Sequence, residues 1–129
     1  MPFIRDDRAL IDERTDLVVA RSVVRAAGAL SRSLGLMAFR PAPDDALWLE
    51  PCNGIHTFLL RRAIDVIVLD RSLRVVALRR AVPPWRIVLP VRGGHTTVEL
   101  TAGAIDAAGV QVGDTLRLLR APGPGGASG

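Results

Sequence analysis

The chain has 129 residues, a length that supports one hydrophobic core and therefore one domain. It carries 17 arginines, no lysine and 13 acidic residues, for a formal net charge of +4 at pH 7. Its apolar runs are too short to span a membrane, and its lone cysteine excludes an internal disulfide framework. Because the apolar runs are short, we expect no membrane partner. Acidic and basic residues alternate without a basic block, so we expect no specific nucleic-acid partner either. The charges near the N-terminus differ from a secretory signal and predict a cytoplasmic protein.

Three regions are expected along the chain. Residues 1–15 are highly charged and predict an irregular N-terminal arm. Residues 16–121 are expected to form a single β-rich domain, and residues 122–129 a disordered tail rich in glycine and proline. The domain opens with β-branched residues over 17–24 that favour a strand.

The first of two short helices is expected at residues 26–39. Leu30, Leu34 and Met37 follow one another at helical spacing, and the prolines at 41 and 43 end the pattern. Thr101 is expected to cap a second short helix over 102–108, which Gly109 ends.

Between these helices the chain has the composition of β-strands. Strands are expected at 46–49, 55–60, 64–69, 74–78, 85–89 and 95–100, with a last one at 115–119 after the second helix. An open sheet of such short strands would expose its edges. The sequence therefore predicts an α+β, β-rich fold in which an antiparallel or mixed sheet is barrel-like or strongly curled.

Several motifs follow one another at fixed spacing. They read RSLGLM at 32–37, CNGIHTFLLRRAIDV at 52–66, PWR at 84–86, RG at 92–93 and ELTAG at 99–103, followed by glycines at 109 and 113. Over about residues 17–118 this series resembles the domain of unknown function 192 family. The resemblance implies a small barrel-like α+β domain of bacteria and archaea with no established activity, and it supplies no catalytic residues. The chain departs from the family pattern at Leu60, at Arg62 and Ala63, and at Thr101.

A group of polar and aromatic residues interrupts the apolar strands: His56, Arg61, Asp65, Trp85, Arg92 and Glu99. A buried carboxylate at Asp65 needs a partner, and we expect Arg61 first and Arg92 second. The group has two interpretations. It is either a structural ion-pair network or a pocket in which arginines hold an anionic or hydroxyl-rich ligand beside a tryptophan.

Residues with metal-binding or nucleophilic chemistry lie near this group. Cys52, His56 and His95 could supply three metal ligands. Along an extended strand, however, Cys52 and His56 lie about 13 Å apart, so we expect no metal and no other cofactor. A thiol at Cys52 with His56 and Asp65 would be the enzymatic arrangement.

The sequence favours a non-catalytic binding or accessory module for a small molecule or a protein partner. One alternative is a hydrolase-like enzyme that uses His56 and Asp65. Another is a weak nucleic-acid binder that uses its arginines. The first two differ in whether His56, Arg61 and Asp65 meet in an open pocket or lie in a buried network.

Overall fold

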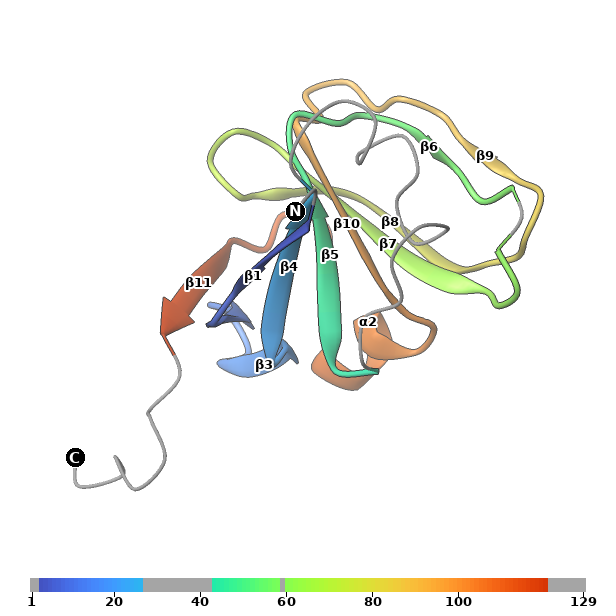
Figure 1. Ribbon diagram of the computed structural model, residues 1–129. Helices are drawn as coiled ribbons and strands as arrows, with labels where there is room; N and C mark the ends of the chain where they lie inside the picture. Colours follow the sequence, from blue (N-terminus) through green and yellow to red (C-terminus); the bar gives the residue numbers. More distant parts are fainter. Residues whose placement is uncertain (1–2, 27–42, 59, 121–129) are drawn as a thin grey trace.

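The computed structural model describes residues 3–26, 43–58 and 60–120. Within them lie eleven strands in three sheets and one short helix (Figure 1). The helix expected at 26–39 falls outside these residues except for Ala26, which ends a strand, and the expected tail at 122–129 lies wholly outside them. The β-rich α+β class predicted from the sequence is confirmed.

The largest sheet has six strands in the order β1-β4-β5-β10-β7-β8. These strands are β1 (Phe3–Asp6), β4 (Ser22–Ala26), β5 (Asp45–Leu49), β10 (Thr96–Thr101), β7 (Ile64–Leu69) and β8 (Val75–Val82). Only β4 and β5 run parallel among its neighbouring strands, so the sheet is mixed. Strands β1 and β8 remain as its two edges, so the described strands do not close into the barrel that was one expected form.

A second sheet joins the two ends of the described chain. It contains β2 (Arg8–Asp12), β3 (Leu17–Ala20) and β11 (Leu116–Arg120), in the order β11-β2-β3. The prediction of an irregular arm at 1–15 is therefore wrong for residues 3–12. Charges around it mask a short apolar run, Ala9-Leu10-Ile11, which is buried and pairs with a strand near the other end of the chain.

The described helix, α2 (Ala104–Ala108), is shorter than expected. Its N-cap is Gly103, whereas Thr101 is the last residue of β10 and donates its hydroxyl hydrogen to the carbonyl of Pro43. Gly109 ends the helix in a left-handed conformation, as predicted. No helix in the described part of the chain has the length and apolar character needed to cross a membrane.

The main core lies between one face of the six-stranded sheet and the layer formed by α2 and the second sheet. Trp48, Ile67 and Val98 from the large sheet share this core with Leu10 and Ile105. Alternate residues of the same strands point to the opposite face, where two smaller clusters form.

A two-stranded ribbon of β6 (Ile55–His56) and β9 (Ile87–Val88) packs on this second face. Ile55 and Val88 are the ribbon residues that join its apolar clusters. In Figure 1 the ribbon occupies the end of the molecule away from β11. This position leaves the outer side of the ribbon free of the core.

Candidate functional site

The buried carboxylate of Asp65 has a different partner from the one expected. Its Oδ2 accepts hydrogen bonds from the amides of Gly103 at 3.1 Å and Ile105 at 2.9 Å. Its Oδ1 accepts one from the amide of Ala81 at 2.9 Å. The prediction of an arginine partner is wrong, because Arg61 and Arg92 are exposed and do not reach it. The first amides of a helix have no hydrogen-bond acceptor within the helix, so they are free to donate to a carboxylate. Here they supply the hydrogen bonds that an arginine side chain was expected to supply.

Glu99 is also buried, at 4% exposure, but it belongs to the other face of the large sheet. In β10 it stands between Leu47 of β5 and Val66 of β7, residues of the two smaller clusters. Asp65 instead shares the face of the main core. The structure therefore separates the two acidic residues of the predicted group.

His56 and Trp85 do come together, through Phe58. The ring centroids of His56 and Phe58 lie 4.8 Å apart, and those of Phe58 and Trp85 lie 5.6 Å apart. Phe58 was absent from the predicted group. Its place two residues after His56, on the same side of an extended segment, is the signal that could have found it.

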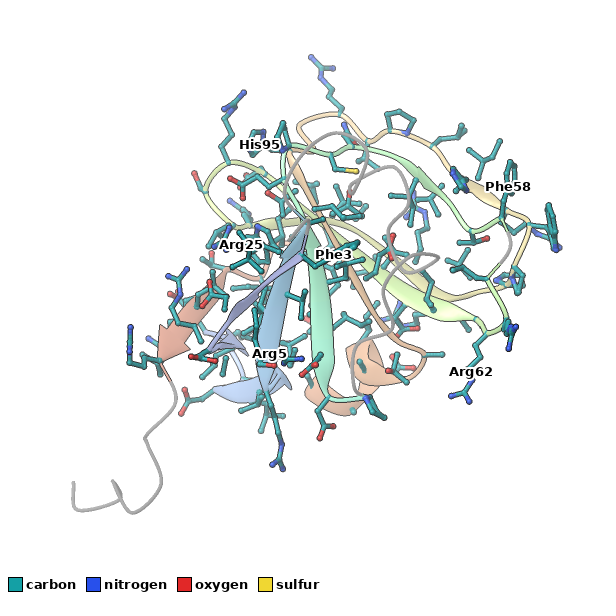
Figure 2. All side chains as sticks on the ribbon, in the orientation of Figure 1. Phe3, Arg5, Arg25, Phe58, Arg62 and His95 are labelled. Atoms are coloured by element: carbon teal, nitrogen blue, oxygen red, sulfur yellow. The ribbon has the colours of Figure 1, made fainter. Side chains whose placement is uncertain are left out.

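Two aliphatic side chains extend this aromatic cluster along β9. Ile87 stands opposite His56 in the ribbon, and Leu89 follows two residues later. We call the outer surface formed by His56, Phe58, Trp85, Ile87 and Leu89 the ribbon face. Its exposed fractions are 36% for Phe58, 60% for Trp85, 63% for Ile87 and 71% for Leu89. Figure 2 shows Phe58 at the ribbon end of the molecule.

Thr57 lies beneath the ribbon face and stabilises it with hydrogen bonds. Its side chain is fully buried, and its hydroxyl donates to the carbonyl of Pro83 at 2.7 Å and accepts from the amide of Arg86 at 2.9 Å. Its carbonyl accepts from the amide of Trp85 at 3.0 Å. These bonds fix Trp85 at φ 65, a left-handed conformation that is costly for a residue with a side chain.

The CNG motif at 52–54 connects the segment before β6 with the segment after β9. Asn53 donates its amide hydrogen to the carbonyl of Val91 at 2.6 Å and accepts from the amide of Val91 at 2.8 Å. A Cβ at position 94 would lie 2.5 Å from the Asn53 side chain, so Gly94 is required for this approach. The motif thus has a structural role in fixing the two loops.

Cys52 and the two histidines are not arranged as a metal site. The Cys52 thiol faces the carbonyl of Gly54 at 3.5 Å. His95 instead lies beside Glu50, with 3.9 Å between Nε2 and Oε2, and His56 contacts Phe58. In residues 3–26, 43–58 and 60–120 no group of three or more histidine, cysteine or acidic side chains could hold a metal ion.

A carboxyl pair that sequence reasoning missed joins β2 to the turn before β11. Burial and the neighbouring carboxyl of Asp114 raise the pKa of Asp12. The hydrogen bond from Arg14, at 2.8 Å, lowers the pKa of Asp114 to about 2. Oδ2 of Asp12 is buried and accepts no hydrogen bond from the described residues, which agrees with the raised pKa of this carboxyl. The position of Asp12 directly after an apolar run is the only sequence signal for this pair.

Comparisons with known proteins bear on the whole domain. The sequence model of the domain of unknown function 192 family, described as "Uncharacterized ACR", matches residues 11–118. A UPF0127 protein of Pyrococcus furiosus is 37% identical over 96 residues, which are 70% of this chain and 81% of that protein. A UPF0127 protein of Thermococcus sibiricus is 42% identical over 63 residues, 49% of this chain and 40% of that protein. Both relatives are archaeal.

Two bacterial crystal structures share the fold. One, titled a "putative transcription regulator" from Sinorhizobium meliloti, has a TM-score of 0.72 and 18% identity, over 92% of this chain and 96% of that one. The other, a protein of unknown function from Novosphingobium aromaticivorans, has a TM-score of 0.70 and 13% identity, over 85% and 83%. At these identities the likeness concerns the fold alone.

Proposed function

The chain belongs to the domain of unknown function 192 family, and we propose from its surface that it is a non-catalytic binding module whose partner-binding surface is the ribbon face. The observation that carries this proposal is the exposure of Ile87 in β9 and of Trp85 and Leu89 on either side of it. Single apolar residues are common on protein surfaces, whereas a contiguous group marks an interaction site. Phe58, which follows β6 and stacks on Trp85, extends the group.

The backbone at Trp85 supports the same conclusion. A glycine would adopt φ 65 without cost, yet this position carries the largest side chain type and exposes it. The strain is held by Thr57, whose hydrogen bonds reach both sides of the tryptophan. Strain that presents an exposed side chain is typical of binding sites.

The enzymatic alternative receives less support from the geometry. Asp65 is occupied by three backbone amides, and the Nδ1 atom of His56 accepts from the amide of Phe58 at 3.3 Å. A histidine that acts as a base needs a carboxylate or similar group to orient it. The structure puts Asp65 in the core and His56 on the ribbon face, so the proposed hydrolase pair is not formed.

The two tryptophans make a direct test available, because Trp48 is buried at 1% exposure and Trp85 is exposed. The chain labelled with 5-fluorotryptophan gives two fluorine resonances in solution. Extract from cells that contain the protein, separated into small-molecule, protein and lipid fractions, is added in turn. We expect one fraction to shift or broaden the Trp85 resonance and leave the Trp48 resonance in place.

Two results would oppose the proposal. In one, no fraction changes the Trp85 resonance. In the other, both resonances respond equally, which would indicate a change in the whole fold. Leu119→Ala, at an exposed position of β11, is a matched control that should respond as the parent does. A cytoplasmic location stays a part of this proposal, and cell fractionation tests it.

A further inference from the structure

The positive charge of the chain is concentrated around the ribbon. Residues 51–64 and 79–95, which contain the ribbon and its connections, carry six arginines and no acidic residue. The remaining residues carry eleven arginines and thirteen acidic residues. These two segments therefore have a formal charge of +6 and the rest of the chain −2. The charge is therefore divided unevenly between the ribbon segments and the rest of the chain.

All six of these arginines are exposed. In the described part of the chain Arg80 pairs with Asp106 at 2.8 Å, whereas the other five, Arg61, Arg62, Arg79, Arg86 and Arg92, pair with no carboxylate. Arg86 lies between Trp85 and Ile87 in the sequence, so charge directly borders the apolar side chains. Figure 2 shows Arg62 at the same end of the molecule as Phe58.

This combination of chemistry points to one kind of partner. Resting on the proposed function, and departing from the sequence-based expectation of no membrane partner, we propose that the ribbon face docks on an anionic lipid surface, with Phe58, Trp85, Ile87 and Leu89 at the acyl boundary and the arginines among the headgroups. Aromatic side chains favour the membrane interface, and arginines keep their charged ends in the headgroup layer. Anionic headgroups attract arginines that lie near the surface.

Two other occupants fit the surface less well. A second copy of the chain would bring two surfaces of like charge together, which opposes association. Single-stranded nucleic acid needs free aromatic faces on which bases stack, but Phe58 lies between the rings of His56 and Trp85. Ile87 and Leu89 also offer bases nothing to stack on. An acidic protein surface is the alternative that the experiment must separate.

The experiment measures the binding of the full chain to vesicles by co-sedimentation. One set contains phosphatidylcholine alone and the other a mixture of phosphatidylcholine and phosphatidylglycerol. We expect binding to the mixed vesicles to be at least about tenfold tighter and to weaken as salt is added. The emission of Trp85 should move to shorter wavelength on binding, while buried Trp48 contributes a constant background.

Matched variants identify the surface. Trp85→Ala should weaken binding to mixed vesicles at least about tenfold. The double variant Arg86→Ala and Arg92→Ala should also weaken it at least about tenfold, because each arginine contributes about fivefold to the affinity. The control removes the same charge from β11, through Arg117→Ala and Arg120→Ala, and should keep nearly the parent affinity. Thermal unfolding of every variant checks that the fold is retained.

The outcomes are distinct. Equal binding to both kinds of vesicle, no binding to either, or an equal loss in the β11 control would overturn the lipid inference. If the vesicles fail but the protein or small-molecule fraction shifts the fluorine resonance of Trp85, the proposed binding function stands and the lipid inference is wrong. If neither the vesicles nor any fraction gives a response, both proposals are wrong.

Discussion

At the scale of single residues, Asp65 shows how one carboxylate can serve two elements. It accepts from the amides at the start of α2 and from the amide of Ala81 in β8. Ala81 lies beside an irregularity in the pairing of β7 with β8. The carboxylate thus replaces partners that a regular helix and a regular ladder could not supply.

This arrangement predicts a large effect of Asp65→Ala on stability. The change leaves three amides without their acceptor, and we expect the free energy of unfolding to fall by about 3 kcal/mol or more. Asp65→Asn retains one acceptor oxygen and should lose less. Urea denaturation measures both. Arg61→Ala and Arg92→Ala are controls that should stay within about 0.5 kcal/mol of the parent, and a large loss in either would restore an arginine partner for Asp65.

The carboxyl pair of Asp12 and Asp114 predicts a specific pH dependence. Because the pKa of Asp12 is raised in the folded state, its contribution to stability is present at low pH and is lost as the pH rises through that pKa. The pKa of Asp114 is lowered to about 2, so its contribution is present at neutral pH and is lost as the pH falls toward that value.

Asp12→Asn removes the pH-dependent contribution of Asp12 to stability, and the new side chain can donate an amide hydrogen to Asp114. We therefore expect the variant to be more stable than the parent at pH 7, with a difference that narrows as the pH is lowered to about 4. Denaturant unfolding at both pH values measures this. Asp7→Asn, at an exposed position, should leave the difference between the two pH values unchanged. A variant less stable than the parent at pH 7 would contradict a raised pKa of Asp12.

At the scale of elements, two alanines are expected to respond oppositely to the same substitution. Ala81 has φ 48, so Ala81→Gly relieves a left-handed strain and should raise the free energy of unfolding by about 0.5 to 1 kcal/mol. Ala107 lies exposed in α2, where Ala107→Gly should lower it by about 1 kcal/mol. Thermal unfolding compares them. Destabilisation by Ala81→Gly would show that the strain is absent.

The ribbon depends on the hydroxyl of Thr57. Thr57→Val preserves the shape but leaves the carbonyl of Pro83 and the amide of Arg86 without this partner, and we expect a loss of about 1 to 3 kcal/mol. Thr57→Ser keeps the hydroxyl and should retain most of the stability. Acrylamide quenching of Trp85 fluorescence reports whether the ring keeps its position. Equal stability of the Val and Ser variants would indicate that the hydrogen bonds are replaced by water.

Strand chemistry was the part of the fold that the sequence predicted well. The run at 64–69 matches β7, because a continuous β-branched segment is buried on both faces. Strand β2 was missed, because charges surround its three-residue apolar run and its partner β11 is distant in sequence. Strand β1 was missed as well, because it is short and contains the charged residues Arg5 and Asp6. The ribbon strands are shorter than predicted, since the left-handed backbone at Trp85 interrupts regular pairing.

The candidate site was predicted in part. Of the predicted polar group, His56 and Trp85 both contact Phe58, whereas Asp65 lies in the core. Charge alone suggested an arginine for Asp65, because nothing in the sequence shows where a backbone amide will lack a partner. The exposure of Ile87 and Leu89 could not be predicted either, since apolar strand residues are ordinarily buried.

At the scale of the whole molecule, the core is completed by a strand near the C-terminal end of the chain. Leu116 of β11 is 1% exposed and belongs to the main core, whereas Leu119 is 47% exposed. Leu116→Ala should therefore lower the free energy of unfolding by about 2 to 5 kcal/mol, and Leu119→Ala by less than about 1 kcal/mol. Denaturant unfolding measures both. Similar small losses would show that β11 adds little to the core.

The pairing of β2 with β11 also affects how the protein is made. A ribosome releases residues 8–12 long before residues 116–120, yet these residues form neighbouring strands. Until β11 emerges, β2 can pair only with β3 in this sheet, so one strand edge of the nascent chain stays open to other chains. The sheet can therefore be completed only after β11 has left the ribosome, and this open edge is where aggregation would begin if synthesis stalled between the two strands.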